Sequence, residues 1–247
     1  MKVFRTILLS VSSCMPAAAL SCDLALALAV DVSGSVDARE YEIQMQGLAQ
    51  GLRDPIVSEA LVRANARLML VQWTGASRQQ ITVPWTEIDS FEALERFAEV
   101  VEQDRRVWRN YSTAIGEALL AALDQFGEVS HCKRRLIDLS GDGVSNEGVE
   151  PTALHPRLKA AGIVVNSIAI EESEPDLTAY FFENVIVGEG AFVVSASGFE
   201  DYPERIRKKL LREVTQQTAN DDTRGNRFFM PESELTRLTK FRDHGFD

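Results

Sequence analysis

Short apolar runs alternate with amphipathic stretches along most of the chain. Residues 24–30 are apolar throughout, which is typical of a parallel strand buried on both faces of a sheet. Similar runs predict strands over residues 68–73, 136–139, 163–170 and 191–194. Apolar residues at helical spacing predict helices over residues 37–52, 91–101, 115–123, 152–161 and 202–214. This alternation predicts an α/β fold in which a doubly wound sheet carries helices on both faces.

One further strand is expected to run antiparallel at the edge of the sheet. Residues 74–77 turn the chain after the strand at 68–73, and residues 80–83 return alongside it. Pro84 is expected to end this returning strand, because proline cannot donate a hydrogen bond to a neighbour. The sequence therefore predicts a mostly parallel, six-stranded sheet with one antiparallel edge strand.

The first residues have the pattern of a secretory signal peptide. Lys2 and Arg5 give a positive start, residues 7–11 are apolar except for Ser10, and residues 17–19 are alanines suited to cleavage. The alternative is a buried N-terminal helix. We expect a signal peptide over residues 1–21, a folded domain over 22–215, and a polar, flexible tail over 216–247. The protein would then be exported, either periplasmic or secreted.

The cysteines add to this interpretation. Cleavage after the alanines removes Cys14 and leaves Cys22 and Cys132, an even number that favours a disulfide in an exported chain. Two unpaired thiols are the alternative. Cys14 and Cys22 also follow segments that resemble lipoprotein cleavage boxes, so lipid anchoring is an alternative to a free exported form. No later stretch reaches the roughly 18 apolar residues of a transmembrane helix.

Composition limits the class of partner. The chain has 247 residues, 45% of them hydrophobic, and a net charge of −11 at pH 7. This content suits one large domain with a sizeable core. The negative charge repels phosphate backbones, so we expect no binding to nucleic acid.

Oxygen-bearing side chains follow two of the predicted strands and open one predicted helix. Asp31, Ser33 and Ser35 come directly after the first strand, Thr113 opens the helix at 115–123, and Asp142 follows the strand at 136–139. Ligands of open α/β sheets bind beyond the carboxyl ends of the strands. Carboxylate and hydroxyl oxygens are ligands that Mg²⁺ prefers, so these residues predict a magnesium site if the two strands are neighbours. The alternative is a polar turn that caps a helix.

These residues resemble the von Willebrand factor type A domain and its metal-ion-dependent adhesion site. The family pattern is Asp-x-Ser-x-Ser, then a Thr in a middle loop, then an Asp in a loop that often reads Thr-Asp-Gly. The likeness extends from about Asp23 to Val214 and is closest to a bacterial exported branch of unknown function. Shared phrases include Leu-Ala-Val-Asp-Val-Ser-Gly-Ser-Val and Ile-Asp-Leu-Ser-Gly-Asp-Gly, with Val-Pro-Trp-Thr at residues 83–86.

The resemblance implies a strand order of 3-2-1-4-5-6 and a metal site for Mg²⁺ (or Mn²⁺ or Ca²⁺). By that resemblance, Ser33 and Ser35 bind the ion directly, Thr113 binds it directly or through water, and Asp31 and Asp142 supply charge. An acidic residue of a protein partner completes the shell. The chain departs from the family pattern at two positions: Ser112 precedes Thr113 and could substitute for it, and Gly141 stands where many members carry Thr.

The implied strand order also bears on the cysteines. It makes strands one and four adjacent and parallel, so Cys22 and Cys132 would both lie at the edge opposite the metal site. Disulfide formation requires Cα atoms within about 7 Å, which this arrangement permits.

The function expected from these features is an exported, metal-dependent protein-binding module rather than an enzyme. A first alternative is a metal-dependent hydrolase that uses Asp31, although Ser33 stands where an aspartyl phosphotransferase carries its second acid. A second alternative is a metal-free structural or assembly domain. Arg105, Arg106 and Arg109 form a basic cluster near the presumed metal face, which we interpret as a solvated helix end that could also meet an acidic partner.

Overall fold

A computed structural model of the protein describes the backbone of residues 21–172 and 174–225, and the side chains of this part up to residue 215. The signal peptide expected over residues 1–21 lies outside the described residues except for its last position. Of the tail expected over 216–247, only the backbone of residues 216–225 is described.

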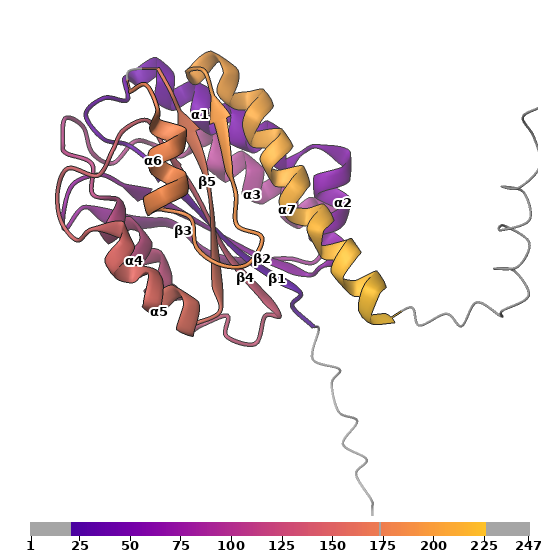
Figure 1. Ribbon diagram of the computed structural model, residues 1–247. Helices are drawn as coiled ribbons and strands as arrows, with labels where there is room; N and C mark the ends of the chain where they lie inside the picture. The colour runs from indigo at the N-terminus through magenta and orange to yellow at the C-terminus, as the bar shows by residue number, and fades with distance from the viewer. Residues whose placement is uncertain (1–20, 173, 226–247) are drawn as a thin grey trace, which may run out of the picture.

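Six strands form one sheet in the order β3-β2-β1-β4-β5-β6 (Figure 1). Their bounds are β1 Leu24–Asp31, β2 Ala66–Trp73, β3 Gln79–Ile88, β4 Arg134–Gly141, β5 Ile163–Ile170 and β6 Val193–Ala196. Only the pair β2–β3 is antiparallel among these named strands. The predicted fold class, the strand order and the antiparallel edge strand are therefore confirmed.

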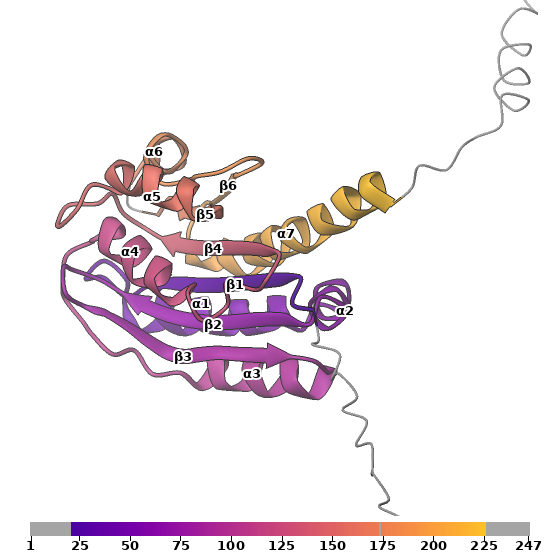
Figure 2. The same cartoon turned by 90° about the horizontal axis from the view of Figure 1, so that it is seen from below.

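Helices cover both faces of this sheet, as Figures 1 and 2 show. One face carries α1 Ala38–Leu52, α2 Pro55–Arg63, α3 Phe91–Gln103 and α7 Tyr202–Gly225. The other carries α4 Ile115–Gln125, α5 His155–Ala160 and α6 Leu177–Asn184. Short 3₁₀ helices at Pro151–Leu154 and Phe199–Asp201 precede α5 and α7. No helix of the described residues is long and apolar enough to cross a membrane.

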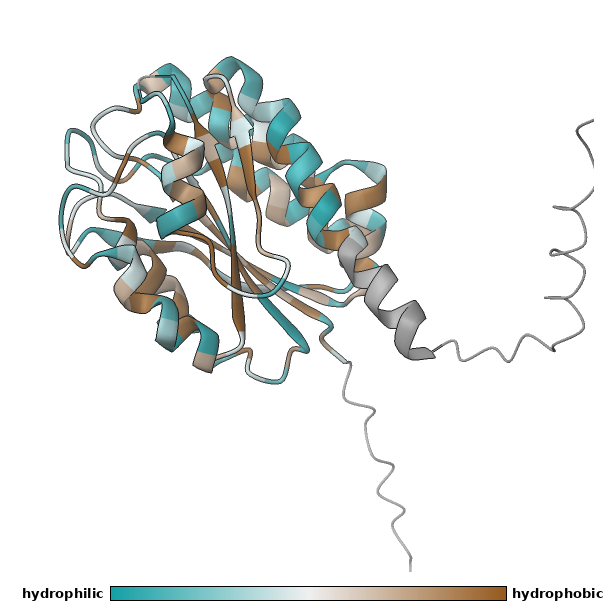
Figure 3. Ribbon diagram, viewed as in Figure 1, coloured by the Kyte–Doolittle hydropathy of each residue, from teal (hydrophilic) through white to brown (hydrophobic). Residues whose placement is uncertain are grey.

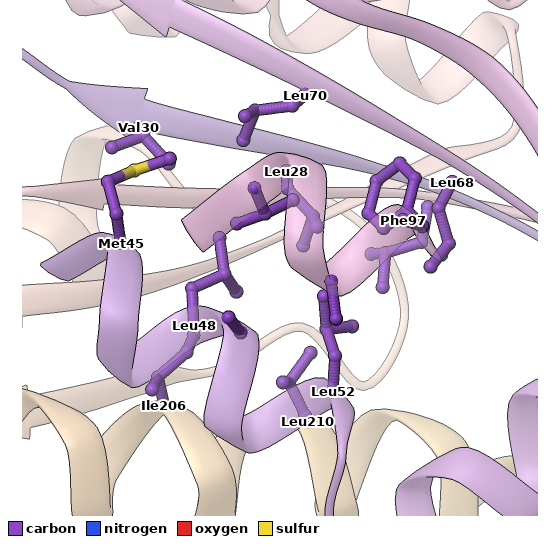
Figure 4. Close-up of a cluster of buried hydrophobic side chains, with 14 of the residues drawn as sticks. Leu28, Val30, Met45, Leu48, Leu52, Leu68, Leu70, Phe97, Ile206 and Leu210 are labelled. Carbon is purple, nitrogen blue, oxygen red and sulfur yellow. The ribbon is translucent and has the colours of Figure 1, made fainter. Parts of the chain in front are cut away.

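The two core layers follow from the alternation of side chains along β1. Leu24, Leu26 and Leu28 point to one face, and the intervening alanines point to the other. The leucines meet α1, α3 and α7, where Met45, Leu48, Phe97, Ile206 and Leu210 complete a cluster (Figure 4). The small alanines let α4 pack close to the sheet on the second face. Figure 3 shows the result as apolar strands at the centre with hydrophilic outer helix surfaces.

Three local predictions were wrong. Pro84 does not end β3, which runs to Ile88; the register with β2 shifts around this proline, as at a bulge, and an edge strand tolerates the missing donor there. The helix predicted over 152–161 begins as a 3₁₀ turn and becomes α5 only at His155. The last helix does not end at Val214, because α7 continues to Gly225.

Two short helices were not predicted. For α2 the signal was present, since Asp54 accepts hydrogen bonds from the backbone of Ile56 and Val57 and Pro55 occupies the first turn. Helix α6 follows Asp176, which has a left-handed backbone with φ of 67° and makes no capping hydrogen bond. The cap comes instead from Glu171 after β5, which accepts from the backbone N–H of Thr178 at 3.0 Å.

A disulfide joins Cys22 and Cys132, whose Cα atoms are 4.6 Å apart. The cysteines precede β1 and β4 at equivalent positions, because Leu24 pairs with Arg134 at the start of the two strands. The predicted disulfide is thus present, at the edge of the sheet opposite the carboxyl ends of β1 and β4. His131 lies beside the two sulfur atoms, but these are bonded to each other in the disulfide and so are not thiolate ligands for a metal ion.

Candidate metal centre

The candidate site lies where two neighbouring parallel strands end. Strands β1 and β4 pair up to Val30 and Ser140, so the loops that follow them leave the sheet side by side. Asp31 is the last residue of β1, and Asp142 comes directly after β4. Both carboxylates are buried, with exposed fractions of 1% and 3%. The topology thus brings together two acids that are more than a hundred residues apart in the sequence.

Hydrogen bonds connect four of the five predicted residues. Asp31 Oδ1 accepts from the backbone N–H of Ser33 at 2.7 Å, which folds the loop back over the strand end. The hydroxyls of Ser33 and Ser35 lie 3.2 Å apart. The Ser35 hydroxyl donates to Asp142 Oδ1 at 2.7 Å. Four oxygen-bearing side chains from two loops therefore converge at one place.

Thr113 approaches the same place from the loop before α4. It is buried, and a Cβ placed on Gly143 would lie 3.8 Å from its Oγ1. Its backbone N–H donates to Asn146 Oδ1 at 2.9 Å, so the two loops are joined. The neighbouring Ser112 hydroxyl is directed elsewhere and donates to Glu147. Of the two hydroxyls that the sequence left open, Thr113 is the one placed beside the Asp142 loop.

The two carboxylates are poorly compensated by the protein. Burial raises the pKa of Asp31 to about 8, and the negative charge of Asp142 adds to the effect. Burial also raises the pKa of Asp142, although the hydrogen bond from Ser35 opposes the shift. Asp31 Oδ2 is buried without a hydrogen-bond partner among the described residues. Two like charges in a desolvated site favour a bound cation.

Several supporting residues were not predicted as part of the site. Gln44, buried on α1, donates to the backbone oxygen of Asp31 at 3.1 Å and accepts from the Ser140 hydroxyl at 3.0 Å. Its sequence signal is a polar side chain on the apolar face of a helix. Arg106 donates to the carbonyl oxygens of Val32 and Ser33. Its basic sequence neighbourhood indicates a solvated helix end, and nothing in the local sequence shows that Arg106 reaches the loop after β1.

Two glycines allow the loops to approach closely. Gly34 donates its N–H to the Tyr111 carbonyl oxygen at 2.7 Å, and a Cβ on Gly34 would lie 3.1 Å from that oxygen. The crowded side of Gly34 faces residues 110–111, so the absence of a side chain there lets the two loops come together. A Cβ on Gly141 would lie 3.2 Å from Asp31 Oδ2 and 3.3 Å from the Trp73 ring. Glycine at position 141 therefore leaves room for the Asp31 carboxylate.

The donor set fits a hard divalent cation. Carboxylate and hydroxyl oxygens alone converge here, and the unpartnered Asp31 Oδ2 supplies a buried negative atom that a cation would satisfy. Mg²⁺ is usually held by one or two carboxylates with further oxygen ligands. Asp31, Ser33, Ser35, Thr113 and Asp142 are the residues that could hold it.

The fold is shared with solved structures that include a von Willebrand factor type A protein. Proximal thread matrix protein 1 from the mussel byssus, in a structure with a zinc-occupied metal-ion-dependent adhesion site, matches at 19% identity and a TM-score of 0.57, over 80% of this chain and 49% of that chain. A von Willebrand factor type A protein from Catenulispora acidiphila matches at 16% identity and a TM-score of 0.57, over 78% and 43%. A pilus adhesin from Lactobacillus rhamnosus GG matches at 11% identity and a TM-score of 0.57, over 80% and 30%.

Such low identities show a shared fold alone, and the chain spans about half the length of the mussel protein and less of the other two. A family model described as "Protein of unknown function (DUF1194)" matches residues 21–218, and the chain belongs to this family. No curated protein with a matching sequence was found.

Proposed function

We propose that the protein is an exported, metal-ion-dependent binding module that captures an acidic group of a protein partner. The observation that carries this proposal is the pair of buried carboxylates, Asp31 and Asp142, one of which has an oxygen without a partner. Ionising both acids without a cation costs free energy, because each charge would be desolvated and the two would repel each other. A site retained at this cost is best explained by a ligand that compensates it.

The residues of the site would have different roles in binding a cation. Asp31 and Asp142 supply negative charge from buried positions, and the buried Ser33 hydroxyl lies 3.2 Å from that of Ser35, which forms the mouth of the site. Ser35 is exposed, so the mouth is open to solvent and to a partner. Thr113 approaches from the third loop. When bound, Mg²⁺ (or Mn²⁺ or Ca²⁺) would supply an open coordination position for a carboxylate of the partner.

Export is part of the proposal. Its support is the leader-like sequence at residues 1–21 and the disulfide between Cys22 and Cys132, because disulfides persist in oxidising compartments. Both a periplasmic and a secreted protein would meet this condition. Fractionation of cells that express the full chain tests it, since an intact leader and a cytoplasmic protein would contradict export.

Calorimetric titration with Mn²⁺ and Mg²⁺ tests the metal site. The purified protein should bind about one ion, and Asp31→Asn should abolish the binding heat because it removes the buried negative charge. Asp89→Asn, an exposed aspartate between β3 and α3, is the matched control and should bind like the wild type.

A metal-induced rise in melting temperature provides a second measurement, because an ion that binds only the folded state stabilises it. Asp31→Asn should stay folded in EDTA, since the amide removes the repulsion between the two acids. Equal Mn²⁺ affinity in the wild type and Asp31→Asn would defeat the assignment. If EDTA changed neither the melting temperature nor the binding of a partner, a metal-free structural domain would be favoured.

A further inference from the structure

A single arginine reaches under the loop that carries the two serines. Arg106 lies between α3 and α4, and its Nη2 donates to the carbonyl oxygens of Val32 at 3.0 Å and of Ser33 at 2.7 Å. The side chain is half-buried. Burial lowers the pKa of Arg106, as does the nearby charge of Arg109, but a guanidinium remains protonated in proteins. A permanent positive charge is therefore fixed at the site by two hydrogen bonds.

This charge acts on both buried acids. The acceptors of Arg106 are the carbonyl oxygens of Val32, which follows Asp31, and of Ser33, whose hydroxyl lies 3.2 Å from that of Ser35, the donor to Asp142. The other acids nearby are differently placed. Asp37 and Glu40 form the capping box of α1, and Glu172 accepts from the backbone N–H of Phe199. Asp37 and Glu172 are exposed, where water and salt screen their charges.

The charges at the centre can be balanced from these groups. Asp31 and Asp142 together neutralise a divalent cation. The guanidinium of Arg106 is then left without a compensating negative charge at the centre, and its Nε has no hydrogen-bond partner among the described residues. One monoanionic carboxylate from a partner would bring the net charge of the cation, Asp31, Asp142 and Arg106 to zero. A site of this kind favours an anionic over a neutral ligand.

We infer that Arg106 is a positioning residue that makes the metal-loaded site select a carboxylate: it holds the metal loop through Val32 and Ser33 and supplies the charge that the carboxylate neutralises. The inference rests on the proposed function, because it concerns the loaded site. It separates two properties that a metal site usually combines. The acids determine whether the cation binds, and Arg106 determines how strongly an outside anion binds afterwards.

Acetate, as a minimal carboxylate, tests this on the Mn²⁺-loaded protein. Water-proton relaxation reports when acetate displaces water from the Mn²⁺ ion, and chloride keeps the ionic strength constant. Calorimetry gives the Mn²⁺ affinity of each variant separately. The variants are Arg106→Gln, which removes the charge, and Arg106→Lys, which keeps the charge but not the planar pair of donors. Arg96→Gln, an exposed arginine on α3, controls for the same change in net charge.

We expect Arg106→Gln to bind Mn²⁺ and to need about tenfold more acetate for half-saturation, as for loss of one nearby charge. Arg106→Lys should be intermediate, and Arg96→Gln should match the wild type. Equal acetate half-saturation in wild type and Arg106→Gln would overturn the inference while leaving the metal site intact. So would loss of Mn²⁺ binding in a folded Arg106→Gln, since Arg106 would then act only on the loop.

Two further outcomes are separable. Absence of Mn²⁺ binding by the wild type would refute the proposed function itself. If Arg106→Gln does not fold, as judged by circular dichroism, Arg106→Lys decides: half-saturation within about fivefold of wild type supports the assigned charge, and a greater rise rejects it.

Discussion

At the scale of single residues, the beginning of α4 is the most crowded place near the site. Gly116 lies in its first turn, and a Cβ there would lie 1.9 Å from the Val149 carbonyl oxygen. The contact is with backbone, so a flexible side chain cannot relieve it. This close approach keeps the loop after Asp142 against α4, where Asn146 accepts from the backbone of Thr113.

Gly116→Ala should therefore destabilise the fold by about 2 kcal/mol or more, as for overpacking of a filled site. It should also weaken Mn²⁺ binding, because the loops that carry Thr113 and Asp142 must move apart. Urea unfolding and calorimetry measure the two effects. Gly127→Ala is the matched control, since nothing lies within 4 Å of a Cβ there. Equal stability of the two variants would contradict this account of Gly116.

The residues of the site differed in how far the sequence revealed them. Asp31, Ser33, Ser35 and Asp142 stand at strand ends, so the sequence predicts their convergence if β1 and β4 are neighbours, as the family resemblance implies. Their role as metal ligands stays a prediction. Arg106 could not be assigned from the sequence. It lies in an irregular loop, and the residues that it contacts, Val32 and Ser33, are more than seventy positions earlier in the chain. Loops lack the periodicity that makes helices and strands predictable.

At the scale of elements, α7 is held to the sheet by a buried ionic cluster. Lys209 on α7 contacts Asp138 on β4 at 2.5 Å and Glu213 at 2.8 Å, and all three are buried. Asn166 on β5 also donates to Glu213 at 2.8 Å. Burial raises the pKa of Glu213 to about 7, and the charge of Asp138 adds to the shift that Lys209 opposes.

This shift predicts a pH-dependent stability. The pKa of Glu213 is higher in the folded than in the unfolded protein, so the folded state binds more protons between about pH 4.5 and 7. The contribution of Glu213 to the free energy of unfolding is therefore greatest below this window and falls as the pH rises through it. Glu213→Gln removes the titration, so its stability relative to wild type should rise by on the order of 2 kcal/mol from pH 4.5 to pH 8.

Urea unfolding at several pH values measures this difference. Glu99→Gln, an exposed glutamate on α3, should run parallel to the wild type throughout. A Glu213→Gln profile that is also parallel to wild type would show that this carboxyl has the same pKa in the folded and unfolded protein.

The elements themselves were predicted where their pattern was long and regular. Strands β1, β2, β4 and β5 and helices α1, α3 and α4 follow apolar periodicity or continuous apolar runs that local sequence suffices to show. The failures lie where tertiary context decides. Pro84 is tolerated because β3 is an edge strand with a bulge, and α6 is capped by the side chain of Glu171 rather than by the adjacent Asp176. The cluster around Lys209 was not predicted, because Lys209 and Glu213 resemble residues of a solvated helix face; the one sequence signal was Asp138, an acid within the apolar run of β4.

At the scale of the whole molecule, the disulfide closes most of the folded domain into one loop. It joins residues 110 positions apart, and it lies at the amino ends of β1 and β4, opposite the candidate site. In the chain-entropy account, a crosslink of this span stabilises the folded state by about 4 to 5 kcal/mol. The double variant Cys22→Ala, Cys132→Ala should lose stability of that order in urea unfolding.

The same variant should keep its Mn²⁺ affinity under conditions where it remains folded, because the site loops do not touch the cysteines. This separates a crosslink that stabilises the fold from one that shapes the site. An unfolding midpoint of the wild type that is unchanged by reduction would contradict the stabilising role. Loss of metal binding in the folded variant would contradict the separation.

Strands β1 and β4 run from the disulfide near their amino ends to the candidate site at their carboxyl ends. A partner that pulls on the Asp31 or Asp142 loop would load both strands lengthwise. Parallel strands under such tension can yield by sliding past each other, which breaks their hydrogen bonds together. Here the disulfide links the amino ends of the two strands covalently, so a force applied to one strand is also transmitted to the other.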